Sequence, residues 1–315
     1  MDSSELQKLA QHTRFMREAG FALLIASGFL AVLLFVPFGT KEAPVATATI
    51  TASTTPDAFA AVPLEAKAAV VYDLVTGETL YEKNPDAQLP LASLTKLLTV
   101  YAALAELSPN TPITISVAAT GSEAPHAFNA GQVFSLSDLA RLTLTASLND
   151  GAAAIIEAAA TRQNRTANEA LASAATALDL AQTYAVNGSG LDASEVTSGG
   201  YGSARDIARL AGALVEKAPD IAAATTEDTA RAVSAGGTVF TVKNTDPLTA
   251  TFPHLLLSKT GYTSLAGGNL ALVFDAGIGH PIAVVVLGSS QKARFTDGTA
   301  LVNATLAHFA GVASL

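Results

Sequence analysis

The chain has 315 residues and no cysteine, so disulfides, thiol nucleophiles and thiolate metal sites are excluded together. Half of its residues are hydrophobic, which excludes disorder for most of a chain that can hold one large domain or two small ones. The formal net charge of −9 makes the chain a poor binder of nucleic acid, and its histidines stand at no metal-ligand spacing, so no zinc site is expected.

The first element along the chain is an uncharged apolar run over residues 21–38. Its length is close to the roughly 20 residues that a helix needs to cross a bilayer. Because Lys8, Arg14 and Arg17 precede it, the positive-inside rule predicts a single-pass membrane protein. Residues 1–20 are expected in the cytoplasm, residues 21–38 as a transmembrane helix in the cell membrane, and everything downstream outside it.

A cleaved signal peptide is the alternative, because small-residue sites follow at Ala46-Thr47-Ala48 and Ala58-Phe59-Ala60. The apolar core of a signal peptide spans about 7 to 15 residues, shorter than this run, which favours an uncleaved anchor. Residues 39–62 are rich in Thr, Ala and Pro and have no helical or strand periodicity. They are predicted to be a linker to a folded domain over residues 63–315.

Within that domain, residues 67–84 are predicted to form two short strands around a Thr76-Gly77 turn. Residues 91–235 are predicted to be largely helical. Three strands at hairpin spacing follow between residues 255 and 288, and a closing helix is expected near 297–310. Strands at both ends with helices between them predict an α+β fold, in which the N- and C-terminal strands form one antiparallel sheet.

The predicted helix within residues 90–104 is apolar on nearly every side and yet carries Lys96. Lysine is rarely buried without a partner, because an ammonium deprived of water tends to lose its proton. Ser93 lies one turn earlier on the same face. In one interpretation Ser93 caps the helix and Lys96 extends its amine to water. In the other they are a serine nucleophile and its base, because side chains at i and i+3 can share a proton.

Two further polar motifs interrupt apolar segments. Ser147-Leu148-Asn149 separates two helical stretches, and Lys259-Thr260-Gly261 ends an apolar strand. Alone, the first is typical of a helix break and the second of an edge strand. Together with Ser93-x-x-Lys96, in this order and structural context, they are the motif set of penicillin-binding proteins and serine β-lactamases.

The surrounding sequence resembles the low-molecular-weight penicillin-binding proteins, the D-alanyl-D-alanine carboxypeptidases of the serine DD-peptidase superfamily. The resemblance covers about residues 67–305 and includes PLASLTKLLT, SLNDGAAA, VKNTDPL and SKTGYTSLAGGNLALV. The chain departs from the family at Leu148 and Ser258, where glycine is usual. Residues 120–132 also fit poorly the loop that roofs the site in family members.

The resemblance implies a serine-type carboxypeptidase that removes the terminal D-alanine of the peptidoglycan pentapeptide and is inhibited covalently by β-lactams. Ser93 is then the nucleophile and Lys96 the base that accepts its proton. Lys96 must be neutral for this, and both burial and the charge of Lys259 are expected to lower its pKa. Ser147 is expected to relay the proton to the leaving amine, and Asn149 to hold Lys96 and the amide on the acyl side of the substrate.

The resemblance also assigns the groups that hold the reacting carbonyl and the substrate terminus. The backbone N–H groups of Ser93 and Tyr262 match the oxyanion hole of the family. The terminal carboxylate is expected to bind Lys259 and Thr260 of the Lys-Thr-Gly motif, which Gly261 completes, with Arg294 as a helper. This chemistry requires no metal and no organic cofactor.

Three alternatives use the same residues. A DD-endopeptidase performs the same reaction on cross-linked peptides. A class A β-lactamase also needs a glutamate that activates water, and no Glu-x-x-x-Asn pattern lies between Asn149 and Lys259. An inactive scaffold that only binds peptidoglycan would not need the complete set of serines, lysines and asparagine. Labelling with a fluorescent penicillin separates a catalyst from a scaffold.

Overall fold

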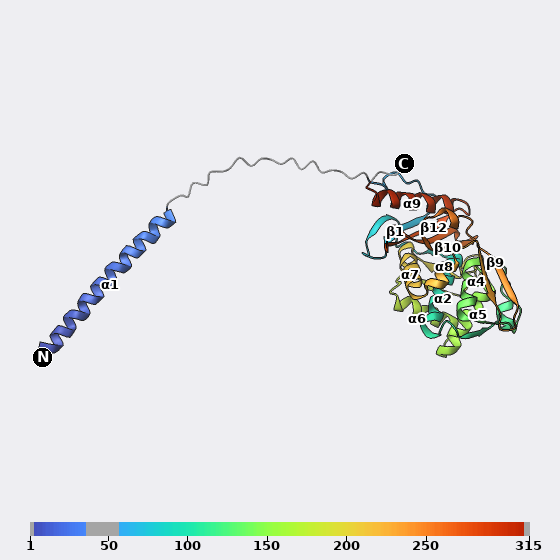
Figure 1. The fold of residues 1–315 in the computed structure, drawn as a ribbon, viewed down its shortest axis with the longest axis horizontal. Helices are drawn as coiled ribbons and strands as arrows, with labels where there is room; N and C mark the ends of the chain where they lie inside the picture. Colours follow the sequence, from blue (N-terminus) through green and yellow to red (C-terminus); the bar gives the residue numbers. More distant parts are fainter. Residues whose placement is uncertain (1–2, 36–56, 312–315) are drawn as a thin grey trace. The chain divides into compact units, whose positions relative to one another are not determined.

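The computed structural model describes residues 3–35 and 57–311, with side chains for residues 11–28 and 57–311, and divides the chain into units Met1–Ser53 and Thr54–Leu315 (Figure 1). In the first unit, Ser3–Phe35 form one helix, α1. Where side chains are described, no helix is both long and apolar enough to cross a bilayer. The predicted span over 21–38 lies partly outside the described residues, as does most of the predicted linker over 39–62.

The second unit is built on one five-stranded antiparallel sheet, in the order β10-β11-β12-β1-β2. Val71 of the first strand lies opposite Val284 of the last, so the two ends of the unit meet at the centre of the sheet. The expected α+β fold with a shared antiparallel sheet is therefore confirmed. The strands are β1 (Ala68–Asp73), β2 (Thr79–Lys83), β10 (Leu255–Thr263), β11 (Gly267–Asp275) and β12 (Pro281–Ser289).

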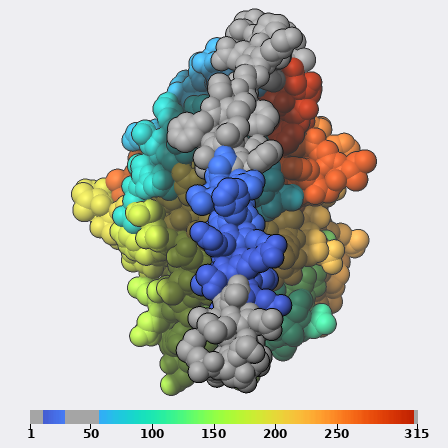
Figure 2. Space-filling view, turned by 90° about the vertical axis from the view of Figure 1, so that its left-hand side faces the viewer, coloured from blue at the N-terminus to red at the C-terminus, as the bar shows by residue number. Residues whose placement is uncertain are grey.

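Both faces of the sheet are covered, which explains why its inner strands are almost continuously apolar. Val284 and Val286 of β12 pack in the core beneath α9 (Ala293–Phe309), whereas Val285 and Leu287 pack in the core shared with the other helices. In Figures 1 and 2 the light-blue and red segments from the two ends of the unit lie at its top, and the green helices at its bottom. The sheet therefore separates α9 from the helical part.

The helical part has the elements that its apolar runs predict, with short two- and three-stranded sheets at its margins. Its helices are α2 (Thr95–Glu106), α3 (Val117–Thr120), α4 (Leu136–Ala146), α5 (Asn149–Gln163), α6 (Ala167–Ala177), α7 (Ala204–Lys217) and α8 (Pro219–Ala224), with 3₁₀ turns η1 (Ala92–Leu94) and η2 (Thr249–Thr251). The short strands are β3 (Leu89–Pro90), β4 (Pro112–Thr114), β5 (Val133–Ser135), β6 (Tyr184–Ala185), β7 (Gly200–Gly202), β8 (Thr229–Val233) and β9 (Val239–Lys243).

The prediction of helix up to residue 235 is wrong at its end, because β8 (Thr229–Val233) is a strand. Burial alternates along it, with Ala230 and Ala232 inside and their neighbours exposed, and it pairs with β9 (Val239–Lys243) as a hairpin. Alanine is a strong helix former, but here the burial repeats every two residues, which is the period of a strand. The hairpin packs against α4, the helix that ends beside Ser147.

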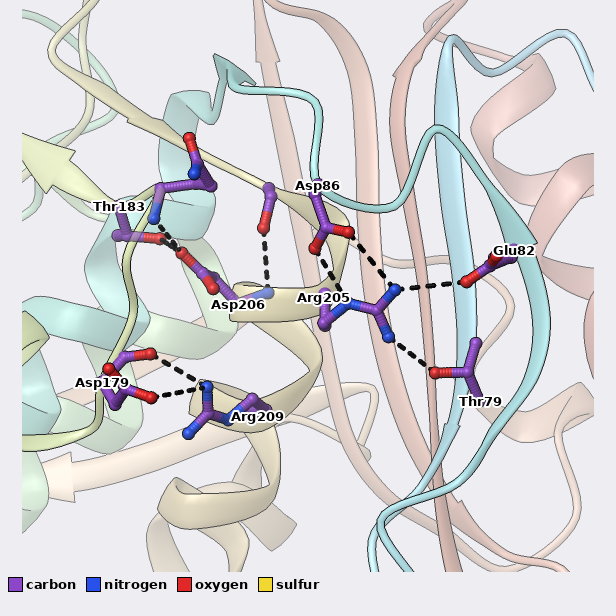
Figure 3. A network of polar contacts seen from close by, with 10 residues as sticks. Thr79, Glu82, Asp86, Asp179, Thr183, Arg205, Asp206 and Arg209 are labelled. Carbon is purple, nitrogen blue, oxygen red and sulfur yellow. Dashed lines mark hydrogen bonds and ion pairs between the residues drawn. The ribbon is translucent and has the colours of Figure 1, made fainter.

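The start of α7 ties the sheet to the segment that leads into the active site (Figure 3). Arg205 donates from Nε to Asp86 Oδ1 at 2.8 Å and from Nη1 to Thr79 Oγ1 of β2 at 2.6 Å. The next residue, Asp206, accepts from the Gln182 backbone N–H at 2.8 Å and the Thr183 hydroxyl at 2.9 Å. Residues 182–183 are thereby fixed just before the chain reaches residues 187–191, which lie against the predicted nucleophile.

Candidate active site

Ser93 lies in the 3₁₀ turn η1 that leads into α2, directly after a strained residue. Ala92 has a φ of 48°, which is unusual for a residue with a Cβ and costs free energy that the surrounding packing must supply. Gly190 packs against it so closely that a Cβ there would lie 1.9 Å from the Ala92 carbonyl oxygen. Within the described residues 57–311, Ser93 makes no capping hydrogen bond at the start of η1 or α2. Its interpretation as an N-cap is therefore wrong.

Lys96 is completely buried, so it does not extend its amine to water. Its Nζ lies 2.9 Å from Ser93 Oγ, 2.7 Å from Asn149 Oδ1 and 2.8 Å from the Ser189 carbonyl oxygen. The orientation of the Asn149 amide is fixed, because its Nδ2 donates to the carbonyl oxygens of Glu123 and Ala124 at 2.9 and 3.1 Å. Two neighbours of Lys96 are thus oxygens that can only accept, whereas the third is a hydroxyl.

These three neighbours suit a neutral amine. A neutral amine has two N–H donors for the Asn149 and Ser189 oxygens and one lone pair that can accept the proton of Ser93. Burial first, and then the positive charge of Lys259, lower the pKa of Lys96 well below that of an ordinary lysine, with Asp150 opposing the change. The expected direction and both expected causes are confirmed, and the pair can transfer a proton from hydroxyl to amine.

Ser147 and Lys259 meet on the other side of the site. Ser147 ends α4 in a left-handed conformation, with φ 59°, so the interpretation as a helix break also holds. Lys259 lies on the edge strand β10, yet it is only 1% exposed, and its Nζ donates to Ser147 Oγ at 3.0 Å and to the Thr260 carbonyl oxygen at 2.8 Å. Burial, and then the charge of Arg294, lower the pKa of Lys259 to about 7, against the effect of Asp246.

The pKa values of the two lysines are lowered by different neighbouring charges. The charge of Lys259 lowers the pKa of Lys96, whereas the charge that lowers the pKa of Lys259 is that of Arg294. The contacts suit a neutral amine beside Ser93 and an ammonium beside Ser147, which would separate a base from a binding site for an anion.

The Lys-Thr-Gly strand lies against the nucleophile turn because of Gly261. A Cβ at this position would lie 2.8 Å from the Leu91 carbonyl oxygen, too close for any other residue without movement of β10 or η1. Thr260 Oγ1 is 2.7 Å from Thr245 Oγ1, and Tyr262 is half-exposed at the strand end. Arg294, at the start of α9, donates from Nη1 to the Gly261 carbonyl oxygen at 2.7 Å. The residues predicted to bind the substrate terminus are thus in or beside one strand, whereas Asn149 lies at the start of α5 beside Lys96.

The two departures from the family are accommodated locally. Leu148 precedes α5 with φ −69°, a conformation open to any residue, and its side chain is buried. Ser258 donates to Asp246 Oδ2 at 2.6 Å, and its backbone N–H donates to Thr225 Oγ1 at 2.9 Å. The loop over residues 120–132 is bound to the site through Asn149 and Asp150, whose Oδ2 accepts from the backbone N–H groups of Ala127 and Phe128.

Sequence reasoning missed two contributors. The Ser189 carbonyl oxygen binds Lys96. In the sequence, only the preceding Asn187-Gly188 pair, which is typical of turns, indicates that the chain bends there. Asp246, within VKNTDPL, is 2% exposed beside the Lys-Thr-Gly strand, and the resemblance of this segment to the family indicates no role for the residue. Among the described residues, no group of three or more His, Asp or Glu side chains is arranged to hold a metal ion.

The comparisons with known proteins identify the family. The model of the peptidase S11 family, D-alanyl-D-alanine carboxypeptidase, matches residues 52–291. The chain therefore belongs to this family of serine peptidases, and the resemblance inferred from its motifs is confirmed. A D-alanyl-D-alanine endopeptidase of Pseudomonas aeruginosa is 31% identical over 260 residues, which are 79% of this chain and 81% of that protein. A D-alanyl-D-alanine carboxypeptidase of Bacillus subtilis is 28% identical over 247 residues, which are 76% of this chain and 61% of that protein.

Solved structures have the same fold. A D-alanyl-D-alanine carboxypeptidase from Mycobacterium tuberculosis is 25% identical with a TM-score of 0.68, and the match covers 81% of this chain and 97% of that one. Penicillin-binding protein D2 from Listeria monocytogenes, solved with ampicillin bound, is 26% identical with a TM-score of 0.62. This match covers 78% of this chain and 99% of that one.

The close approach at Gly261 generates a prediction. Gly261→Ala should push β10 away from η1 and reduce the rate of acylation by a β-lactam about 100-fold, the scale expected when reacting groups move by about 1 Å. Gly277→Ala is the matched control, because a Cβ there meets nothing within 4 Å. Stopped-flow acylation measures both variants. Equal rates for Gly261→Ala and wild type would show that the approach of the two segments does not matter.

Proposed function

We propose that the chain is a serine-type D-Ala-D-Ala carboxypeptidase that acts through an acyl-enzyme on Ser93. The observation that carries the proposal is the fully buried Lys96, 2.9 Å from Ser93 Oγ and surrounded by acceptors that suit its neutral form. The substrate is a peptidoglycan stem peptide that ends in D-Ala-D-Ala, and β-lactams are covalent inhibitors. Complexes of the Listeria monocytogenes relative with ampicillin and with cefotaxime support the second part.

In the acylation step, Ser93 Oγ attacks the carbonyl carbon of the penultimate D-alanine as Lys96 accepts its proton. The negative charge that develops on the carbonyl oxygen is stabilised by the backbone N–H groups of Ser93 and Tyr262, where one such donor is typically worth about 10²–10³ in rate. The C–N bond then breaks, and the proton passes through Ser147 to the departing amine. D-Alanine leaves, and water hydrolyses the ester on Ser93.

Substrate orientation depends on charge and on one amide. The carboxylate of the terminal D-alanine binds the ammonium of Lys259 and the hydroxyl of Thr260, with Arg294 behind them. Two acceptors contact Lys259 Nζ among the described residues, which leaves one of the three ammonium hydrogens for the substrate. Asn149 holds Lys96 through its Oδ1, and its amide lies on the acyl side of the scissile bond.

A second candidate is a DD-endopeptidase, which breaks a cross-link by the same acyl transfer. The relative from Pseudomonas aeruginosa, named an endopeptidase, favours it. The two activities differ in whether the leaving amine belongs to free D-alanine or to a neighbouring stem peptide. Incubating the enzyme with purified pentapeptide monomers and, separately, with cross-linked dimers measures the preference directly.

The proposal also includes a membrane location, with residues 1–20 in the cytoplasm and the catalytic domain outside. The apolar run over 21–38 and the basic residues before it support this arrangement. So does the helical state of its residues as far as Phe35. The anchor would hold the catalytic domain close to the cell wall by a tether over 39–62.

The nucleophile is tested by mass. Treating the purified protein with penicillin should add one drug mass to the peptide that contains Ser93, and a fluorescent penicillin should label the intact chain. Ser93→Ala should abolish both the adduct and the release of D-alanine. An adduct on a different serine would contradict the assignment, and a wild-type protein without any adduct would favour the inactive scaffold.

The role of Lys96 is tested by pH and by arginine. Because the base must be neutral, the acylation rate should rise with pH through the depressed pKa of Lys96, far below that of an ordinary lysine. Lys96→Arg keeps a charge that cannot be lost in this range, so it should lose acylation nearly as completely as Ser93→Ala. Stopped-flow acylation across pH measures both effects. A near wild-type rate in Lys96→Arg would make the lysine a structural cation only.

The anchor is tested by fractionation. Mature protein that keeps its Met1 end should stay in the membrane after alkaline extraction, and external protease should cleave it beyond about residue 40. Replacing two leucines in the centre of the 21–38 run with arginine should release it. Soluble protein that begins near Thr49 or Ala61 would instead identify the run as a cleaved signal peptide.

A further inference from the structure

Asp246 is a buried acid that the mechanism above does not use. It lies in the loop between β9 and η2 and is 2% exposed. Its Oδ2 accepts from Ser258 Oγ at 2.6 Å, and its Oδ1 accepts from the Leu248 backbone N–H at 2.8 Å. None of the described Lys, Arg and His side chains forms an ion pair with it. A buried carboxylate with two neutral donors is costly unless positive charge close by compensates it.

The compensating charges are the two cations of the proposed carboxylate site. Asp246 raises the pKa of both Lys259 and Arg294, against burial, which lowers both. Arg294 is itself poorly satisfied, because its Nε is buried and has no hydrogen-bond partner among the described residues. The geometry places all three groups at β10: Asp246 is bonded to Ser258, the residue before Lys259, and Arg294 is bonded to the Gly261 carbonyl oxygen of the same strand.

Ser258 connects this carboxylate to the strand that carries Lys259. It occupies the position before the Lys-Thr-Gly motif, where the sequence departs from the usual glycine, and its hydroxyl donates to Asp246 at 2.6 Å. The adjoining Thr245 contacts Thr260 of the same motif at 2.7 Å. The loop thus contacts β10 at alternate residues, on either side of Lys259.

We propose that Asp246 is a positioning residue whose negative charge, held on β10 by Ser258, balances one of the two buried cations so that Lys259 and Arg294 together recognise one substrate carboxylate. The inference rests on the proposed function and extends it to how the carboxylate is selected. With Lys259 and Arg294 both charged, the cluster carries one net positive charge, which a single terminal carboxylate neutralises. Without Asp246 the same pocket holds two uncompensated cations. Lys259, which has the lower pKa of the two, then loses its proton more readily.

The experiment is a pH profile of Asp246→Asn with a peptide that ends in D-Ala-D-Ala and a free carboxylate. Other charged groups near Lys259 are Arg294 on α9 and Lys96 on α2, whose own pKa is lowered by burial and by the charge of Lys259. Binding needs a charged Lys259, so kcat/KM of the wild type should fall as pH rises through its pKa of about 7. Removing the negative charge lowers that pKa, so the falling limb should move down by about 1 pH unit. At pH 8 this corresponds to about a tenfold loss of kcat/KM.

Asparagine is suited to this site, because its Oδ1 can accept from Leu248 while its Nδ2 donates to Ser258. Asp246→Ser removes the same charge and is measured in parallel. If one of the two variants does not fold, the other still tests the inference. Ser258→Ala is the matched control, since it removes one hydrogen bond and keeps the charge, which the Leu248 backbone N–H still holds in place. Its melting temperature should fall, while its falling limb stays near that of the wild type.

A peptide with a C-terminal amide provides an internal control, because it has no carboxylate for Lys259. Its falling limb should be weak or absent in the wild type and unchanged in Asp246→Asn. If the folded Asp246 variants lose activity equally at every pH, Asp246 is merely structural and the inference is wrong. Failure of the proposed function looks different, because the wild type would then neither bind penicillin covalently nor release D-alanine.

Discussion

The exclusion of water from Lys96 is the constraint on which the rest of the site depends. A lysine amine in water is protonated at neutral pH and cannot accept the proton of a serine. Burial in the apolar start of α2 removes the stabilisation of the charged form, and the neighbouring Lys259 opposes a second charge. The carbonyl groups of Asn149 and Ser189 then hold the neutral amine with its lone pair available to Ser93. The apolar helix is thus part of the chemistry as well as part of the core.

This constraint forces a division of charge across the site. One lysine has to be neutral and the other charged, although the two are close enough to affect each other. The fold separates them by their partners. Lys96 contacts Ser93 and two carbonyl oxygens, whereas Lys259 contacts Ser147 and the Thr260 carbonyl oxygen, and Asp246 favours its charged form as Asp150 does for Lys96. The lowered pKa of Lys96 and the pKa of Lys259, about 7, therefore both affect the pH range in which the site works.

The parts of the site that could be predicted from sequence are those that depend on the identity of a side chain. Ser93, Lys96, Ser147, Asn149 and Lys259 stand in three short motifs, and the apolar periodicity around them predicts the helices and the strand that carry them. The Ser189 carbonyl could not be found this way, because every residue has one and only the packing of Gly190 on Ala92 brings it to Lys96. The β8 hairpin was not predicted, because its alanines favour a helix. The strand forms because only one of its faces is buried.

One departure from the family, the loop over residues 120–132, is connected directly to the residues around Lys96. Asn149 holds Lys96 through Oδ1, and it also binds the 120–132 loop through Nδ2 and through its backbone N–H, which donates to the Pro125 carbonyl oxygen at 2.7 Å. Asp150, completely buried, binds the same loop at Ala127 and Phe128. The loop that differs most from the family is therefore fixed by the residue that orients the base. Differences between a carboxypeptidase and an endopeptidase can arise in such a loop while the proton transfer stays the same, because its backbone rather than its side chains makes the connection.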